Sequence, residues 1–425
     1  MSERLRNDMR AARRASGMPW ATFARAAGFG AAYLRNVENG NRPVTASVTT
    51  AYDLVLRTGG AFANGLADAP AVTGMHTPWT GATLAVLTEL VDGRRVDRRS
   101  FITAGIALSA SASNWSRAVA ATAHDRPAAT DGPRLLVHLE DRLEYLRRVD
   151  DELGSGEVHK QAGGELSLVV RLIKAGRHTD ADLRRLYAIA AEASRQVAWT
   201  AFDQSRFGIA QRYFDAALRA SVEAEDVVTG AYALSFAAIQ CYSTGQAGRA
   251  VSLLDTARTQ IRGRATPRMD AMLAARTARA LSKTGAKADT AHQLHLARTA
   301  LDKGRHDDDP KTLYWVDYGE VEMIAGSAAL DLGDPAEALR RFAAGMEAYP
   351  GDEDYPRTHA IYLARAAEAH LALDDIDGAV ATAHHAAACL SSVDSARSAS
   401  QLKGLRDKLA PHANYRPVAE FLQGG

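Results

Sequence analysis

Alanine residues recur from residue 210 onward at a nearly constant spacing, and this periodicity limits the fold more than any other feature of the chain. Equivalent alanines stand at Ala210, Ala250, Ala291, Ala338 and Ala379, separated by 40, 41, 47 and 41 residues. A fixed period of about 20–50 residues is typical of repeat proteins, in which one supersecondary unit stacks on the next. Apolar residues within each period follow helical spacing, so the predicted unit is a pair of helices.

A second set of small residues supports this period. Twelve positions before four of those alanines stands another tiny residue, at Ala198, Ala238, Gly326 and Ala367. Small residues at both places let the two helices of a hairpin approach closely. In the third unit Arg279 occupies this place, between Ala278 and Ala280, which leaves the register open by one residue. An alanine-rich chain can match an alanine template by chance, but turns such as Thr244-Gly245 and Leu332-Gly333 precede each second helix at nearly the same offset.

The clearest unit begins at Gly333 with GDPAEALRRF, ends at Pro350, and resembles the second helix of a tetratricopeptide hairpin. The period exceeds the ~34 residues of a standard tetratricopeptide, and lengthened loops such as Gly304 to Lys311 would account for the difference. Residues 134–176 look like one further helical pair, and residues 395–423 like a closing helix with a short cap. Strand signals are nearly absent. The sequence therefore predicts an all-α fold.

The front of the chain has a different organisation. Short helices are predicted over residues 5–16, 20–27, 31–38 and from about Thr45 to Leu56. Residues 1–70 carry nine Arg and five acidic residues, a net charge of +4, so the other 355 residues sum to −3 within the overall charge of +1. A small basic segment thus precedes a larger, mildly acidic body.

Composition divides the chain into three predicted parts. Residues 1–60 hold the short helices, and residues 133–425 hold the helical repeats. Between them, residues 61–132 are rich in Gly, Ala, Thr and Pro, which predicts a linker or hinge with one or two helices.

The segment from Met18 to Gly40, MPWATFARAAGFGAAYLRNVENG, resembles the helix-turn-helix of the phage-repressor and Cro-like (XRE) family of bacterial regulators. In that family the second helix of the motif enters the major groove of double-stranded DNA and its N-terminal residues contact base edges. Carried over by position, the residues that the resemblance assigns to base reading are Gly30, Ala31, Ala32, Arg35 and Asn36. Arg35 is suited to guanine and Asn36 to adenine, each through two hydrogen bonds. A solvated helix face is the alternative for both.

The same resemblance implies contacts with the DNA backbone, which position the protein without reading sequence. The residues assigned to phosphate are Trp20, Thr22, Arg25, Asn39, Asn41 and Arg42. Trp20 departs from the family, which usually has a polar residue at this place. Its indole N–H can still donate one hydrogen bond to a phosphate.

The whole chain resembles a group of actinobacterial regulators that join this helix-turn-helix to tetratricopeptide repeats. WTAFD at 199–203 followed by AQRYF at 210–214 is similar to their first clear repeat, and LRDKLAPH at 405–412 to their last helix. The resemblance implies a cytoplasmic, nucleoid-associated transcription factor that controls specialised metabolism or development. We expect a homodimer, formed through the repeat domain, on a palindromic operator. A scaffold or antitoxin-like adaptor, whose repeats hold a protein partner, is the alternative.

In a tetratricopeptide superhelix the first helix of each pair lines the concave surface. Counting from the small residues, those expected to point there are Arg195, Trp199, Phe202, Asp203, Tyr232, Ser235, Tyr242, Arg276 and Glu320. Aromatic residues near an arginine and an aspartate suit a pocket for a small, partly apolar ligand or a peptide. Packing between helices is the alternative for Trp199 and Phe202. No asparagine lies between Asn114 and Asn414, which disfavours a peptide clamped by asparagine amides.

Other function classes lack a sequence signature. Two cysteines, Cys241 and Cys389, are too few for a disulfide framework. The N-terminus has no apolar stretch typical of a secretory signal, and no segment is expected to enter a membrane. No phosphate-binding loop, zinc motif or serine nucleophile motif is present. We therefore expect a protein that is not an enzyme and needs no cofactor or metal.

Overall fold

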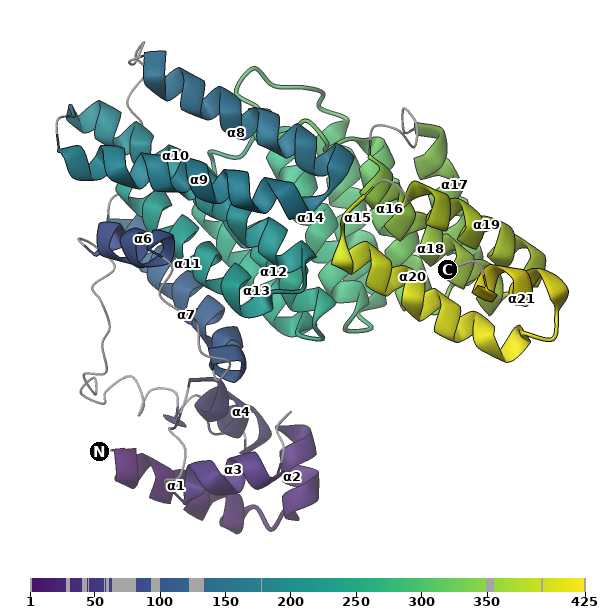
Figure 1. Cartoon of the computed structure of the whole chain (residues 1–425). Helices are drawn as coiled ribbons and strands as arrows, with labels where there is room; N and C mark the ends of the chain where they lie inside the picture. Colours follow the sequence, from purple (N-terminus) through teal and green to yellow (C-terminus); the bar gives the residue numbers. More distant parts are fainter. Residues whose placement is uncertain are drawn as a thin grey trace. The chain divides into compact units, whose positions relative to one another are not determined.

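The computed structural model of the chain describes residues 2–27, 31–39, 44, 46–56, 58, 61–62, 82–92, 100–121, 134–176, 178–348, 355–390 and 393–423. Helices, turns and loops make up these residues, and no β-strand occurs among them, which confirms the predicted all-α class (Figure 1). The chain divides into two compact units, Met1–Thr77 and Pro78–Gly425, called unit 1 and unit 2 below.

Unit 1 contains α1 (Ser2–Ala15), α2 (Trp20–Ala26), α3 (Ala31–Glu38) and α4 (Ala46–Leu56). Its core includes the fully buried side chains of Met9, Phe23, Leu34, Val37 and Tyr52. The rings of Phe23 and Tyr52 meet edge to face with their centroids 4.8 Å apart, which joins α2 to α4. The bounds of α2 and α3 agree with the helices predicted over 20–27 and 31–38 to within one residue.

Unit 2 is built mainly from helical hairpins. The described part of it contains six in succession: α8 (Arg134–Leu153) with α9 (Ser155–Ala175), α10 (Asp180–Asp203) with α11 (Phe207–Glu223), α12 (Val227–Ser243) with α13 (Ala247–Gln260), α14 (Pro267–Ser282) with α15 (Lys287–Leu301), α16 (Tyr318–Asp331) with α17 (Pro335–Ala348), and α18 (Pro356–Ala372) with α19 (Ile376–Cys389). Helices α20 (Ala396–Leu409) and α21 (Arg416–Gln423) follow. Within the described residues no helix combines the length and apolarity that a membrane crossing requires.

From α10 onward, small residues lie where the two helices of a hairpin meet. Fully buried alanines at these places are Ala198, Ala210, Ala238, Ala250, Ala278, Ala338, Ala367 and Ala379. At Gly326 an added Cβ would lie 2.7 Å from the ring of Phe342, so the close approach requires glycine. In the hairpin of α14 and α15, Ala291 is exposed and Thr290 is buried. The sequence-based placement of Ala291 was therefore wrong by one residue, because the buried position is Thr290, twelve residues after Ala278.

Two helices from the segment predicted as a linker belong to unit 2. Helix α6 (Thr83–Val91) places its buried Leu87 in a core shared with α8, α9 and α10. Helix α7 (Ser100–Ala121) buries Trp115 completely, and the indole Nε1 donates to Ser221 Oγ at 2.9 Å. Residues 82–92 and 108–119 thus contribute to the repeat body as packed helices.

The first hairpin of unit 2 contacts both the last hairpin, through Asp150 and Arg357 at 2.7 Å, and the segment after it, so the hairpins form a closed ring. The Ser155 amide donates to the Asp394 carbonyl at 3.0 Å, and the Asp394 amide donates to the Leu153 carbonyl at 3.1 Å. Gly154, with φ of +85°, permits this approach, since an added Cβ would lie 2.5 Å from the Asp394 carbonyl oxygen. Figure 1 shows the start of α20 beside the ends of α8 and α9. In an ordinary solenoid each repeat contacts only its neighbours.

Candidate functional site

A buried carboxylate fixes the orientation of α3 in unit 1. Glu38, 4% exposed, ends this helix and accepts hydrogen bonds from Arg13 Nε at 2.7 Å and Arg13 Nη2 at 2.9 Å. The Tyr52 hydroxyl donates to the same carboxylate at 2.8 Å. Burial, together with the hydrogen bond to Glu38, raises the pKa of Tyr52 well above its usual value, so this hydroxyl stays a donor. One side chain therefore ties α3 to both α1 and α4.

Arg35 lies one turn before Glu38 on α3, at the edge of the buried face of the helix. Leu34 and Val37 are fully buried, whereas Arg35 is exposed. Its guanidinium lies 5.4 Å from the ring centroid of Trp20, which is half-buried at the start of α2. Arg13 stacks on the same ring at 3.7 Å. Trp20 thus packs against two arginine side chains, and its hydrogen bond to a phosphate stays a prediction.

The other residues assigned to DNA are placed as follows. Ala31 is half-buried at the first position of α3, Thr22 is exposed on α2, and Asn39 is exposed and accepts from Arg10 Nη2 at 3.4 Å. Three more lie in described helices but their side chains are outside the description: Arg25, Ala32 and Asn36. Gly30, Asn41 and Arg42 lie outside the described residues altogether. Base and phosphate contacts remain predictions.

Unit 2 contains a cavity of about 430 Å³, partly open to solvent, within the ring of hairpins. First helices of the hairpins, α8, α10, α12, α14, α16 and α18, supply most of its wall, together with α20 and the loop before α16. Ligand pockets for small molecules have volumes of roughly 300–1,000 Å³. The cavity is therefore of a size that suits a small organic molecule.

Most of the residues predicted to face the concave surface lie on this cavity. Seven of the nine line it: Arg195, Trp199, Phe202, Tyr232, Tyr242, Arg276 and Glu320. The other two lie behind the wall and contact lining arginines. Asp203 is fully buried and accepts from Arg397 Nε at 3.1 Å, and Ser235 accepts a hydrogen bond from Arg276. The structure thus brings the nine together around one space.

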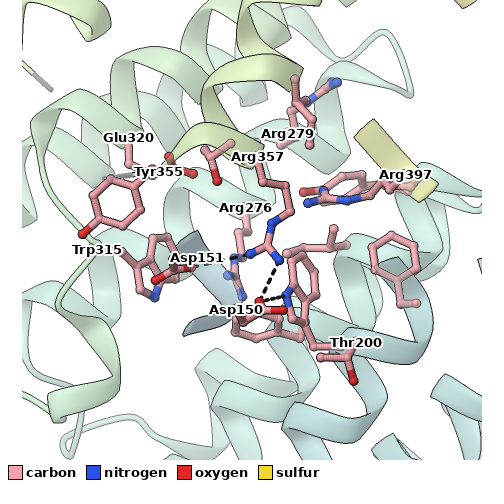
Figure 2. Close-up of a pocket in the computed structure, with 18 of the residues that line it drawn as sticks. Asp150, Asp151, Thr200, Arg276, Arg279, Trp315, Glu320, Tyr355, Arg357 and Arg397 are labelled. Carbon is pink, nitrogen blue, oxygen red and sulfur yellow. Dashed lines mark hydrogen bonds and ion pairs between the residues drawn. The ribbon is translucent and has the colours of Figure 1, made fainter. Parts of the chain in front are cut away.

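Asp150 and Arg357 form the centre of one wall. Arg357 Nη1 donates to Asp150 Oδ2 at 2.7 Å, and the Trp199 indole donates to the same oxygen at 3.0 Å (Figure 2). Ser155 Oγ donates to the other oxygen, Oδ1, at 2.8 Å. Both charged side chains are less than a tenth exposed. The pair therefore joins α8, α9, α10 and α18 at the place where the ring closes.

Asp151 lies beside this pair and accepts a hydrogen bond from the Tyr314 hydroxyl. Its Oδ1 is 3.5 Å from Arg357 Nη2. Burial raises the pKa of Asp151 to about 6, although the charge of Arg357 opposes the effect. Asp151 is thus a cavity-lining carboxyl that titrates just below neutral pH.

The carboxylate of Glu192 forms ion pairs with two other arginines of the wall. Arg195 makes two hydrogen bonds of 2.8 Å to its carboxylate, and Arg147 Nη1 makes a third, also at 2.8 Å. Burial would raise the pKa of Glu192, but Arg195 and Arg147 outweigh it and lower that pKa to about 2. Arg195 also lies 4.6 Å above the ring of Phe236. On this side of the cavity, two arginines share one carboxylate and one of them also packs on an aromatic ring.

Sequence reasoning missed the residues that close the ring. Asp150, Asp151, Arg357 and Arg397 all line the cavity, but none follows the repeat register. They come from α8, α18 and α20, where the array begins and ends. An Asp-Asp pair at the end of a predicted helix is the only local signal, and it is common on protein surfaces.

Comparisons with known proteins add no relative to this description. No protein-family model matches the chain, and no curated protein is significantly similar to it in sequence. The two features that bear on function are the exposed side of α3 in unit 1, which carries Arg35, and the cavity of unit 2.

Proposed function

We propose that the chain is a sequence-specific DNA-binding transcriptional regulator whose repeat body senses a small-molecule effector. In this proposal unit 1 is a helix-turn-helix of the phage-repressor type, and unit 2 is a tetratricopeptide-like array. The observation that carries the proposal is the division of α3 into a face locked in the core and a face that exposes Arg35. An arginine on such a helix can donate two hydrogen bonds to guanine in the major groove.

The geometry around α3 supports this role in two further ways. Glu38 holds the helix through Arg13 and Tyr52, so its exposed face is presented by a rigid element. Residues 1–70 carry a net charge of +4, which favours approach to phosphate. Arg35 packs near Trp20, and this contact limits the freedom that its side chain would lose on binding.

The size of the cavity favours a small effector over the scaffold alternative. The two ends of the array meet at Gly154 and Asp394, which limits the concave surface available to a protein partner. A volume of about 430 Å³ is also too small for an extended peptide of many residues. An effector would act by binding one conformation of the regulator more tightly than another.

The proposal includes a homodimer, formed through the repeat domain, that sets two recognition helices about 34 Å apart on a palindromic operator. It places the protein in the cytoplasm, on the nucleoid, with double-stranded DNA as its partner. Sedimentation of the full chain with and without operator DNA tests the dimer: a single copy on each operator would rule it out.

Selection of genomic fragments by the full chain, followed by gel shifts at fixed salt, tests DNA reading. Arg35→Ala should lower affinity for the selected fragment about 5- to 150-fold, the loss expected for one bidentate base contact. Arg14→Ala, which removes an exposed arginine of α1, is the matched control and should keep the preference for that fragment. If the unsubstituted chain selects no fragment, the regulator proposal fails. A protein partner recovered in stoichiometric amount would then favour the scaffold.

A further inference from the structure

Arg276 differs from the other charged residues of the cavity. Cations that line it and have a carboxylate within 4.0 Å are Arg147, Arg195, Arg279, Lys283, Arg357, Arg365 and Arg397. Among the described residues no carboxylate lies that close to Arg276, which is only 5% exposed. Its position in α14 thus holds a buried guanidinium without an ion-pair partner.

The immediate surroundings of Arg276 do not neutralise its charge. Its Nη1 donates to Ser235 Oγ, and its guanidinium lies 4.3 Å from the ring centroid of Phe236 and 4.9 Å from that of Trp315. Figure 2 shows Arg276 and Trp315 among the residues that line the cavity. Burial lowers the pKa of Arg276, but a guanidinium remains protonated at neutral pH. The carboxylate of Glu320, on the same cavity, acts on Arg276 from beyond ion-pair distance. A buried cation without a direct ion pair is costly, so its remaining donors are suited to an anion.

The same face of α14 carries two more cations. Arg279 and Lys283 follow Arg276 at three and seven residues, which places all three on one side of the helix. Both interact with Asp331, Lys283 at 3.3 Å, and Arg365 from α18 interacts with the same carboxylate at 2.6 Å. Three cations therefore share Asp331, and Arg365 also pairs with Glu368 at 2.9 Å, so these three cations outnumber their two carboxylates by one.

The pKa values reflect this excess of positive charge. Burial and the neighbouring Arg365 lower the pKa of Arg279 to about 10, and burial with Arg279 lowers that of Lys283 to about 8. These shifts oppose those on the facing wall, where carboxylates raise the pKa of Arg195 and Arg357 despite burial. The α14 wall is thus the side of the cavity that attracts an anion.

We infer that the cavity binds a small organic acid, with one carboxylate or phosphate group on Arg276 and a flat apolar body against Tyr232, Phe236 and Trp315. The inference rests on the proposed effector role and names the chemistry of the effector. A guanidinium makes paired hydrogen bonds with either kind of anion. Aromatic side chains of the wall supply the apolar contacts that such a molecule needs.

Calorimetry of the full chain with three naphthalene probes tests the inference. The probes are 2-naphthoate, 2-naphthyl phosphate and the neutral 2-naphthamide, which has the shape of naphthoate without its charge. At least one anion should bind about 10-fold or more tightly than the amide, and comparison of the two anions distinguishes carboxylate from phosphate. In Arg276→Met this preference should disappear while the amide affinity stays the same. Arg416→Met, which alters an exposed ion pair with Glu420, should behave as the unsubstituted chain.

Three outcomes would overturn the inference. They are equal affinity for all three probes, no binding of either anion at millimolar concentration, and a charge preference that survives in Arg276→Met. Thermal unfolding without a probe adds a fourth test, because Arg276→Met should be at least as stable as the unsubstituted chain if no internal carboxylate partners Arg276. A large loss of stability would show a structural role instead. The calorimetry is done without DNA. A negative result there would count against the organic-acid inference alone, whereas a failure to select DNA fragments would count against the proposed function.

Discussion

Arg357 Nη1 lies 2.7 Å from Asp150 Oδ2, although 207 residues separate the two in the chain. The contact joins the first hairpin of unit 2 to the last, and neither side chain is more than a tenth exposed. Two hydrogen bonds from Trp199 and Ser155 complete the coordination of the carboxylate. The cavity is therefore closed by a buried ion pair and not by apolar packing alone.

Arg357→Met should destabilise unit 2 strongly. The substitution leaves Asp150 buried without its cation, and breaking a buried pair in this way costs about 3–5 kcal/mol. Denaturant unfolding of the full chain measures the loss. Arg416→Met removes an exposed pair with Glu420 and should change the free energy of unfolding by less than about 1 kcal/mol. Similar effects of the two substitutions would contradict a closing role for Arg357.

Gly154→Ala should open the ring, since the new Cβ would lie 2.5 Å from the Asp394 carbonyl oxygen and φ is +85°. Gly164→Ala is a matched control within α9, where nothing lies within 4 Å of the added atom. It should stabilise the helix by about 1 kcal/mol. Small-angle scattering and the midpoint of thermal unfolding compare the two variants. A Gly154→Ala chain with unchanged dimensions and midpoint would show that the contact tolerates a side chain.

The raised pKa of Asp151 should make stability depend on pH. A folded-state pKa of about 6 exceeds the ordinary value of 3.8, so this group's contribution is present below the lower value and is lost as pH rises towards the higher one. Relative to the unsubstituted chain, Asp151→Asn should therefore gain stability between about pH 4 and pH 6. Unfolding midpoints across this range measure the difference. A difference that does not vary with pH would mean that Asp151 titrates normally.

Glu38→Gln should loosen α3 more than Tyr52→Phe does. The first change leaves Arg13 buried without its carboxylate, at a cost of about 3–5 kcal/mol. The second removes one hydrogen bond from a carboxylate that keeps its arginine, at a cost of about 1.5–3 kcal/mol. Hydrogen exchange of the α3 amides in the full chain reports both. The reverse order would show that Tyr52 is the main anchor.

Local patterns predicted the helices and much of the repeat register. Start and stop residues such as Pro19, Gly28 and Gly40 placed α2 and α3 to within one residue. Twelve-residue pairs such as Ala198 and Ala210 are fully buried, because close helix contacts select small residues directly. The register of the hairpin of α14 and α15 was misplaced because its buried position holds Thr290 and not alanine. A search for this repeat by residue size should therefore allow threonine, as well as alanine and glycine, at the buried position.

Long-range contacts could not be read from the sequence in the same way. The meeting of Asp150 and Arg357 depends on the summed curvature of six hairpins, and no local spacing encodes that sum. Trp115 was missed because the Gly- and Ala-rich residues around it are typical of linkers, whereas its burial comes from packing on α11 and α12. Glu38 was read only as a helix end, although its carboxylate organises unit 1.

The closed ring also has a consequence for how unit 2 unfolds. An open solenoid frays from its ends, because a terminal repeat has one neighbour and the inner ones have two. In this chain the Leu153–Ser155 and Asp394 backbone contacts give the terminal hairpins a second neighbour, so no hairpin is a natural starting point for melting. Loss of any one of them exposes two interfaces at once. Unit 2 therefore gains the all-or-none cooperativity of a globular domain while keeping the construction of a linear array.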